Sequence, residues 1–223
     1  SKVQAQEAKG SVLSESTRTR AQKLSDPKQD DASKKSQYVI VLDAGHGGKD
    51  EGAVSDDGKL EEKEYNLAVV KEIARLLEQS GVKVYCTRTT DRTVSKKARV
   101  RLANKRQADM LVSVHCNASD ARKHSVRGIE VLYSKRDNGA GYTNKQLAAK
   151  LLKKTVAATG LPARGVIRRE DLYLMHHAKV PAVIVETGYL TNPSDCLYMR
   201  QEKGIRQTAW GIYQAVMETL EKY

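Results

Sequence analysis

The strongest constraint on the fold of this chain is an alternation of short apolar segments with amphipathic segments, beginning at residue 38. Strand-like apolar patterns occur at residues 38–44, 83–88, 110–118, 128–134, 172–179 and 181–190. Apolar residues at helical spacing predict helices at 61–81, 94–107, 143–159, 194–202 and 204–221. Apolar strands that alternate with helices are typical of parallel sheets covered on both faces. The sequence therefore predicts an α/β fold: a single domain with a twisted, mostly parallel β-sheet and helices on both faces.

Residues 1–37 have a different composition, with no aromatic residue and few large aliphatic residues. Such a segment buries too little apolar surface to offset the entropy that it loses on ordering. We predict a disordered or tether-like tail at 1–37. The remaining residues, 38–223, are predicted to form one folded domain, since their number suits a single core.

The chain is strongly basic, with 39 Lys and Arg against 27 Asp and Glu and a net charge of +12. A surface of this sign favours polyanionic surroundings such as nucleic acid, an anionic membrane or an acidic cell-wall polymer. Aromatic residues are scarce, with no Phe and one Trp. This scarcity disfavours a binder of single-stranded nucleic acid, which needs aromatic side chains on which bases stack.

The three cysteines, Cys86, Cys116 and Cys196, do not form the pattern of a disulfide framework. They lie in apolar or strand-like segments and are predicted to be buried free thiols. No apolar run reaches the length of a membrane span, and no signal peptide is visible.

Three of the predicted strands end in residues that can carry chemistry. The segment DAGH ends in His46, SVHCN contains His115, and VIVETG contains Glu186. Because parallel strands place their carboxyl ends at the same edge of a sheet, these three residues are predicted to converge. Two imidazoles and a carboxylate are a known ligand set for catalytic Zn²⁺, which keeps an open position for water. Further acidic candidates, Glu61, Glu62 and Glu64, stand at the start of the next predicted helix.

Each candidate also has a purely structural explanation. His46 can belong to a glycine-rich turn, His115 can be a core histidine, and the three glutamates can favour a helix N-terminus by their charge. Glu186 is harder to explain structurally, because a carboxylate in an apolar strand is costly unless it is paired or bound to metal. The pair His176-His177 lies on a predicted strand, where neighbouring side chains point in opposite directions, so at most one of them can join a site.

Five ordered blocks over residues 38–221 resemble the zinc-dependent N-acetylmuramoyl-L-alanine amidases of bacterial cell walls, of the amidase type 3 class. The blocks are VLDAGHGGKDEGA, EEKEYNLAVVKEIARLL, VYCTRTTDRTVSKKARVRLANKRQADMLVSVHCNAS, RGIEVLY and VPAVIVETGYLTNPSD. The resemblance implies an α/β catalytic domain with one Zn²⁺ held by His46, Glu62 and His115. It also implies that Glu186 is the catalytic acid and base rather than a ligand. The chain departs from the family at residues 95–98, SKKA, where the family tends to have a leucine and an acid.

The implied reaction is hydrolysis of the amide between the lactyl group of N-acetylmuramic acid and L-alanine in peptidoglycan. A zinc-bound water would attack this amide, and Glu186 would move the water's proton to the leaving nitrogen. The resemblance further implies an extracytoplasmic location, a peptidoglycan substrate and no nucleic-acid partner. A protein partner for targeting or regulation would suit a domain without wall-binding repeats. The alternatives are a zinc peptidase acting within the stem peptide and a non-catalytic wall-binding module.

Overall fold

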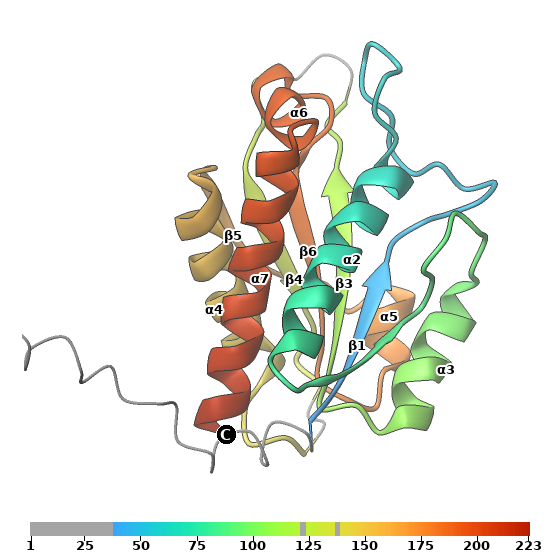
Figure 1. The fold of residues 1–223 in the computed structure, drawn as a ribbon, viewed down its shortest axis with the longest axis vertical. Helices are drawn as coiled ribbons and strands as arrows, with labels where there is room; N and C mark the ends of the chain where they lie inside the picture. Colours follow the sequence, from blue (N-terminus) through green and yellow to red (C-terminus); the bar gives the residue numbers. More distant parts are fainter. Residues whose placement is uncertain (1–37, 121–123, 137–138) are drawn as a thin grey trace, which may run out of the picture.

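One six-stranded sheet organises the chain, with the strand order β2-β1-β3-β6-β4-β5 (Figure 1). The computed structural model describes residues 38–120, 124–136 and 139–223, so the tail predicted at 1–37 lies outside the described residues. The strands are β1 (Val39–Ala44), β2 (Lys83–Cys86), β3 (Met110–Asn117), β4 (Ile129–Tyr133), β5 (Ala163–Arg168) and β6 (Ala182–Tyr189). All neighbouring strands are parallel except β4 and β6, which are antiparallel. The strands β1, β3 and β6 therefore end at the same edge of the sheet.

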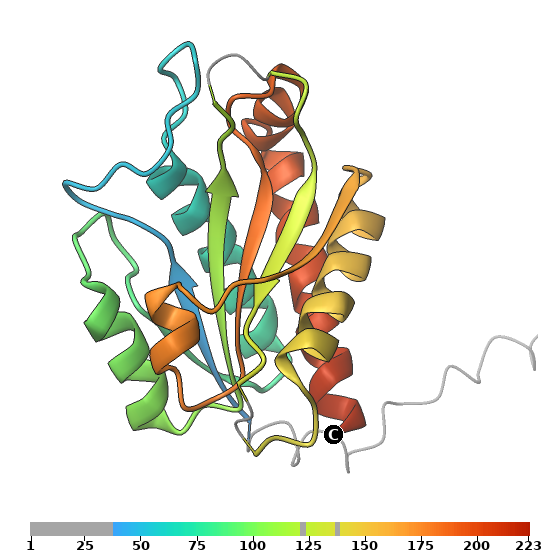
Figure 2. The ribbon, with the colours of Figure 1, turned by 180° about the vertical axis from the view of Figure 1, so that it is seen from behind.

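Two layers of helices cover the two faces of the sheet. The helices are α2 (Glu62–Gln79), α3 (Lys96–Arg106), α4 (Asn144–Thr159), α5 (Tyr173–His177), α6 (Pro193–Met199) and α7 (Glu202–Lys222). Helices α2, α4 and α7 cover one face, while α3 and α5 lie on the other, as Figure 2 shows. Among the described residues, no helix combines the length and the apolar character that crossing a membrane requires. The predicted fold class, a mostly parallel sheet with helices on both faces, is confirmed.

The central strands are apolar throughout because both of their faces are buried. In β1, Ile40 and Leu42 belong to the core beneath α2, α4 and α7, whereas Val41 belongs to the core beneath α3 and α5. All three side chains are fully buried. Burial of a side chain of this size contributes about 1.5–3 kcal/mol. This double burial explains why the sequence shows continuous apolar runs rather than alternation.

Two elements differ from the sequence prediction. Residues 172–179 were predicted as a strand, but they contain the short helix α5, in which the adjacent residues Leu174 and Met175 are both buried. The prediction was wrong because a short apolar run does not by itself distinguish a strand from a buried helical turn. Strand β5 was not predicted, because it is an edge strand with two arginines and only Val166 and Ile167 as large apolar residues.

The three cysteines are free thiols. Cys116 and Cys196 are buried, as predicted, and burial raises the pKa of both. Cys86 is only partly buried, so the prediction of burial was too strong for this residue. Its pKa is also raised by burial, to about 11. A raised pKa keeps a thiol protonated, which makes it a poor nucleophile and a poor metal ligand.

Candidate metal centre

The ends of β1, β3 and β6 bring the three predicted residues to one edge of the sheet. His115 on β3 lies opposite Glu186 on β6 in the parallel register. His46 follows β1 by two residues, in the loop that leaves the sheet at this edge. The centroids of the His46 and His115 rings are 5.0 Å apart, with the rings nearly perpendicular at 79°. The convergence expected from the shared direction of the strands is therefore present in the structure.

The glycines beside His46 allow its loop to fold tightly over the end of β3. The N–H of Gly45 donates to the carbonyl of Val114, at 3.0 Å, and a β-carbon at Gly45 would overlap the imidazole of His115. His46 itself has φ 58°, in the left-handed region that few residues with side chains adopt. The close approach at Gly45 thus brings the backbone before His46 into contact with His115.

Glu62 joins the two histidines from a different part of the chain. It is the first residue of α2 and is 3% exposed. Its Oε1 lies 2.9 Å from Nδ1 of His115 and 3.2 Å from Nε2 of His46. The N–H groups of Cys116 and Ala53 donate to its two oxygens, at 3.0 and 2.8 Å. Each carboxylate oxygen of Glu62 is thus held by a backbone N–H group, one from β3 and one from the loop before α2.

The two neighbouring glutamates do not reach this point. Glu61 forms an ion pair with Lys63, at 3.1 Å, and Glu64 is exposed. Backbone geometry explains the difference. Glu61 is the extended N-cap residue that precedes α2, and Glu64, two helical positions after Glu62, points about 200° away from it around the helix axis.

The ligand atoms of His46, Glu62 and His115 all lie within 4.8 Å of one another. Burial alone would lower the pKa of both imidazoles, but the hydrogen bond and charge of Glu62 outweigh it and raise the pKa of each. Burial would likewise raise the pKa of Glu62, but its contacts with His115 and His46 outweigh it and keep the pKa well below its usual range. In the cluster, the ionised carboxylate of Glu62 thus faces one nitrogen of each imidazole, and its charge favours the protonated form of both rings. Such a donor set fits a divalent cation that prefers nitrogen and oxygen ligands, as Zn²⁺ does.

Asp50 orients His46 and was not identified from the sequence. Its Oδ1 is 2.9 Å from Nδ1 of His46, so the opposite nitrogen, Nε2, faces Glu62. A carboxylate behind a histidine ligand fixes the ring and raises its basicity, and loss of such a partner typically costs 10- to 100-fold in metal affinity. The only signal in the sequence is an acid four residues after the histidine.

We therefore expect Asp50→Ala to weaken zinc binding by about 10- to 100-fold without unfolding the protein, because Asp50 is exposed. Competition with a chromophoric chelator measures the affinity. Asp56→Ala is a suitable control, since Asp56 is an exposed acid whose ion pair is with His124, outside the cluster. Equal affinity of Asp50→Ala and wild type would contradict the orienting role.

Glu186 stands beside the cluster without joining it. Its side chain is partly exposed, but Oε2 is buried and has no hydrogen-bond partner among the described residues. Burial raises the pKa of Glu186 to about 7, although the nearby charge of His115 acts in the opposite direction. A buried polar atom without a partner is rare in folded proteins and calls for an explanation. Accepting a proton during a reaction is one such explanation.

Asp43, the acid at the end of the first apolar run, anchors the loop that carries His46. It is 1% exposed and forms an ion pair with Arg99, at 2.6 Å. Arg99 also donates to the carbonyl of His46, at 2.7 Å. Burial would raise the pKa of Asp43, but Arg99 and two hydroxyl donors outweigh it and lower the pKa. Asp43 therefore acts on the loop through Arg99 rather than through an imidazole.

The pair His176-His177 lies away from the cluster, on α5. Both residues are exposed. The ring of His177 stacks on that of Tyr173, with centroids 3.9 Å apart, and its Nδ1 is 3.0 Å from the carbonyl of the same tyrosine. These contacts explain His177 structurally.

A cavity of about 270 Å³ opens beside Glu186 and the two histidines. Its lining comes from the strand ends, the start of α3 and the segment around α5. The lining residues are Asp43, His46, Asp50, Val94, Lys96, Arg99, Ser113, His115, Leu172, Tyr173, Leu174, Ile184 and Glu186. Hence a ligand in this cavity can contact Glu186 and both histidines of the cluster together.

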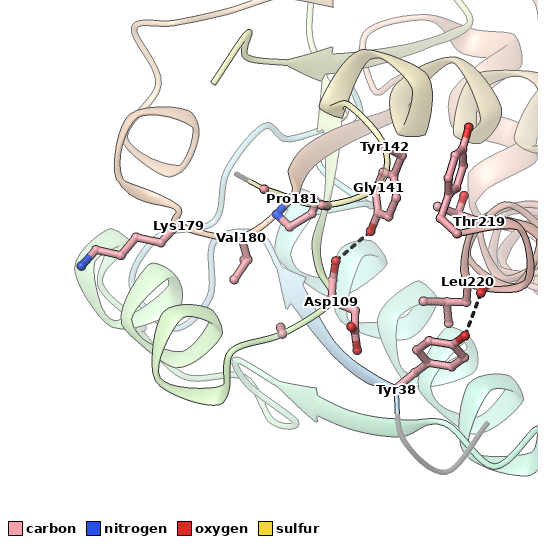
Figure 3. Close-up of a pocket in the computed structure, with 13 residues that line it drawn as sticks. Tyr38, Asp109, Gly141, Tyr142, Lys179, Val180, Pro181, Thr219 and Leu220 are labelled. Atoms are coloured by element: carbon pink, nitrogen blue, oxygen red, sulfur yellow. Dashed lines mark hydrogen bonds between the residues drawn. The ribbon is translucent and has the colours of Figure 1, made fainter. Parts of the chain in front are cut away.

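A second cavity, of about 260 Å³, lies near the start of β1 and is shown in Figure 3. Two tyrosines bridge its walls, since Tyr38 donates to the carbonyl of Leu220 at 2.9 Å and Tyr142 donates to that of Asp109 at 2.7 Å. The side chain of Lys179 points away from these tyrosines in Figure 3. The groups of the metal cluster are absent from the lining of this cavity, so the first cavity is the candidate reactive site.

Residues 40–218 match the N-acetylmuramoyl-L-alanine amidase family, Amidase_3. The chain is 36% identical to the N-acetylmuramoyl-L-alanine amidase LytC of Bacillus subtilis over 163 residues, which are 73% of this chain but 32% of LytC. It therefore spans about a third of the length of that relative.

Two solved structures of similar size have the same fold. The catalytic domain of CwlV, an N-acetylmuramoyl-L-alanine amidase from Bacillus (Paenibacillus) polymyxa var. colistinus, is 33% identical with a TM-score of 0.76, over 83% of this chain and 99% of that chain. The CwlD amidase of Clostridioides difficile, solved in complex with the GerS lipoprotein, is 30% identical with a TM-score of 0.76, over 82% of this chain and 98% of that chain. Together with the match over residues 40–218, these likenesses show that the chain belongs to the N-acetylmuramoyl-L-alanine amidase family.

Proposed function

We propose that this protein is a zinc-dependent amidase that hydrolyses the amide between the lactyl group of N-acetylmuramic acid and L-alanine in peptidoglycan. The observation that carries the proposal is the cluster of His46, Glu62 and His115 beside the unpaired carboxylate oxygen of Glu186. A metal centre with a separate acid–base group is one arrangement that can hydrolyse an unactivated amide. Membership of the family supports the choice of this amide.

In this proposal His46, Glu62 and His115 hold one Zn²⁺. The fit rests on the donor set, two imidazole nitrogens and a carboxylate oxygen that already face one another. Three protein ligands leave room for water and substrate at a catalytic zinc. When bound, Zn²⁺ polarises the scissile carbonyl and lowers the pKa of a coordinated water from about 16 toward about 7.

Glu186 carries the proton through the reaction. It takes a proton from the attacking water, whose oxygen bonds to the carbonyl carbon, and delivers it to the alanine nitrogen as the C–N bond breaks. The products are a lactyl carboxylic acid and a peptide with a free N-terminal alanine. A group that both accepts and donates a proton works best with a pKa near the working pH, and burial raises the pKa of Glu186 to about 7. A bound cation beside it would favour its ionised form.

Mass spectrometry of digested peptidoglycan tests this function. We expect fragments with an intact N-terminal L-alanine and glycan strands that carry free lactyl carboxylates, with no release after treatment with a chelator and recovery after addition of zinc. Shortened stem peptides would instead identify a peptidase. Binding to cell walls without any release would identify a non-catalytic module.

Action on peptidoglycan implies that the protein works outside the cytoplasm, in or near the cell wall. A protein partner that targets or regulates it is also part of the proposal, and the complex of the similar CwlD with a lipoprotein supports this. The predicted absence of a nucleic-acid partner stays a prediction.

A further inference from the structure

The cavity beside Glu186 and the two histidines is lined by one arginine, Arg99, and one lysine, Lys96. Arg99 is 7% exposed, and each of its nitrogens donates to an acceptor inside the protein. The acceptors are Val94 O, Asp43 Oδ1, Ala44 O and His46 O. The side chain of Lys96 is exposed and forms no ion pair or hydrogen bond with any residue that the structure describes. The hydrogen-bond donors of Arg99 are therefore occupied by acceptors within the protein, whereas the ammonium group of Lys96 is free to bind a ligand.

The backbone of Lys96 is fixed at the edge of this cavity. Lys96 is the first residue of α3, and the preceding Ser95 accepts a hydrogen bond from the N–H of Ala98, at 3.2 Å. Further along α3, Val100 and Ala103 are buried in the core beneath the helix. The lysine side chain is thus exposed, while its backbone is held in place by the cap and the packing of α3.

The remaining wall offers little to a charged ligand. Much of it is apolar, with Val94, Leu172, Leu174 and Ile184 among the lining residues. The acids Asp50 and Glu186 also line the cavity and repel an anion. A cation would stabilise a negative group of the substrate in this cavity, and Lys96 is the lysine or arginine of the described lining whose side chain is unpaired.

The proposed substrate carries such a group close to the bond that is cut. In the stem peptide the residue after L-alanine is D-glutamate, which is joined through its γ-carboxyl group. Its α-carboxyl group is consequently free, or is present as a carboxamide where the wall is amidated. This group lies about two residues along the chain from the scissile amide, which is roughly 7 Å.

We propose that Lys96 is a specificity-determining residue that binds the α-carboxylate of this D-glutamate and so favours non-amidated over amidated stem peptides. The inference rests on the proposed amidase function. A partly exposed ion pair is worth up to about 1 kcal/mol, or about fivefold in binding. Lys96 is thereby expected to act on the substrate's KM rather than on kcat, because the carboxylate takes no part in the reaction.

Two synthetic muramyl tripeptides that differ only in this group, carboxylate or carboxamide, test the inference with the zinc-loaded protein. We expect wild type to prefer the carboxylate by about fivefold in kcat/KM, and the preference to shrink at high salt. Lys96→Leu should remove the preference through a higher KM for the carboxylate substrate, and Lys96→Arg should retain it. Lys97→Leu is the matched control, because Lys97 is exposed on the same turn but is not among the residues lining the cavity.

The outcomes separate this inference from the proposed function. If wild type cuts neither tripeptide, the proposed function fails. If it cuts both equally well, or if Lys96→Leu keeps the wild-type ratio, the amidase function stands and the role of Lys96 is wrong. An equal loss of preference in Lys97→Leu would also overturn the inference, because it would mean that overall basic charge rather than Lys96 selects the substrate.

Discussion

Replacing Glu186 with glutamine is expected to lower the turnover of muramyl peptides by about 10²- to 10⁴-fold while zinc stays bound. Glutamine has nearly the shape of glutamate but cannot accept the proton of the attacking water. The cluster of His46, Glu62 and His115 does not include Glu186, so its ligand atoms are unchanged. Turnover on a purified muramyl peptide, together with the zinc content of the same preparation, measures both effects.

The same variant should also be more stable than wild type in the metal-free state at alkaline pH. Glu186 has a pKa of about 7 in the folded protein, against an ordinary value of 4.5. The folded state therefore holds this proton more tightly, so the contribution of Glu186 to stability falls as the pH rises from about 4.5 to about 7. Above that range the ionised group costs roughly 1–3 kcal/mol, allowing for its partial exposure.

Urea unfolding with chelator at pH 8 and at pH 4 checks this expectation. Glu186→Gln should be the more stable protein at pH 8 and should match wild type near pH 4, where both side chains are neutral. Full turnover of Glu186→Gln would contradict the role of Glu186 as base. Lower stability at pH 8 would show that its lost activity reflects damage to the fold.

The sequence predicts the parts of the fold and the site that depend on buried parallel strands. β1, β3 and β6 are buried on both faces, so they appear as apolar runs, and their shared direction follows from the alternation with helices. That direction places His46, His115 and Glu186 at the same edge of the sheet. Their proximity also requires that β1, β3 and β6 are neighbours in the strand order, which local periodicity does not reveal. Edge strand β5 and helix α5 were not predicted, because their short, mixed patterns depend on tertiary neighbours rather than on local periodicity.

The positions of Glu62 and Asp50 beside the histidines could not be predicted from the residue pattern alone. Glu62 is a buried partner of both histidines, but the path of the loop between β1 and α2 decides this, and that path has no periodicity to reveal it. The family resemblance selected Glu62 over Glu61 and Glu64, and the structure places its oxygen between the rings. Asp50 was not considered, because an exposed acid in a loop looks like ordinary surface charge until its distance to His46 is known.

Removing one side chain of the His46, Glu62 and His115 cluster is expected to have a similarly large effect, in this case on zinc affinity. His46→Ala should lower zinc affinity by more than 100-fold, since loss of a residue that only supports a ligand already costs 10- to 100-fold. Activity at sub-micromolar zinc should vanish, whereas Glu186→Gln should keep its zinc. His176→Ala is a matched control, because His176 is an exposed histidine on α5. Isothermal titration of zinc into each metal-free protein measures the affinities.

The structure also predicts how the fold responds to the loss of His46. The imidazole is partly exposed, and the backbone of the loop is held independently, since Arg99 donates to the carbonyl of His46 rather than to its ring. Metal-free His46→Ala should therefore unfold at nearly the same urea concentration as metal-free wild type. Zinc should stabilise wild type but not the variant, because only a protein that binds the metal in its folded state gains stability from it. Equal stabilisation of both by zinc would mean that the metal is held elsewhere, and the proposed centre would be wrong.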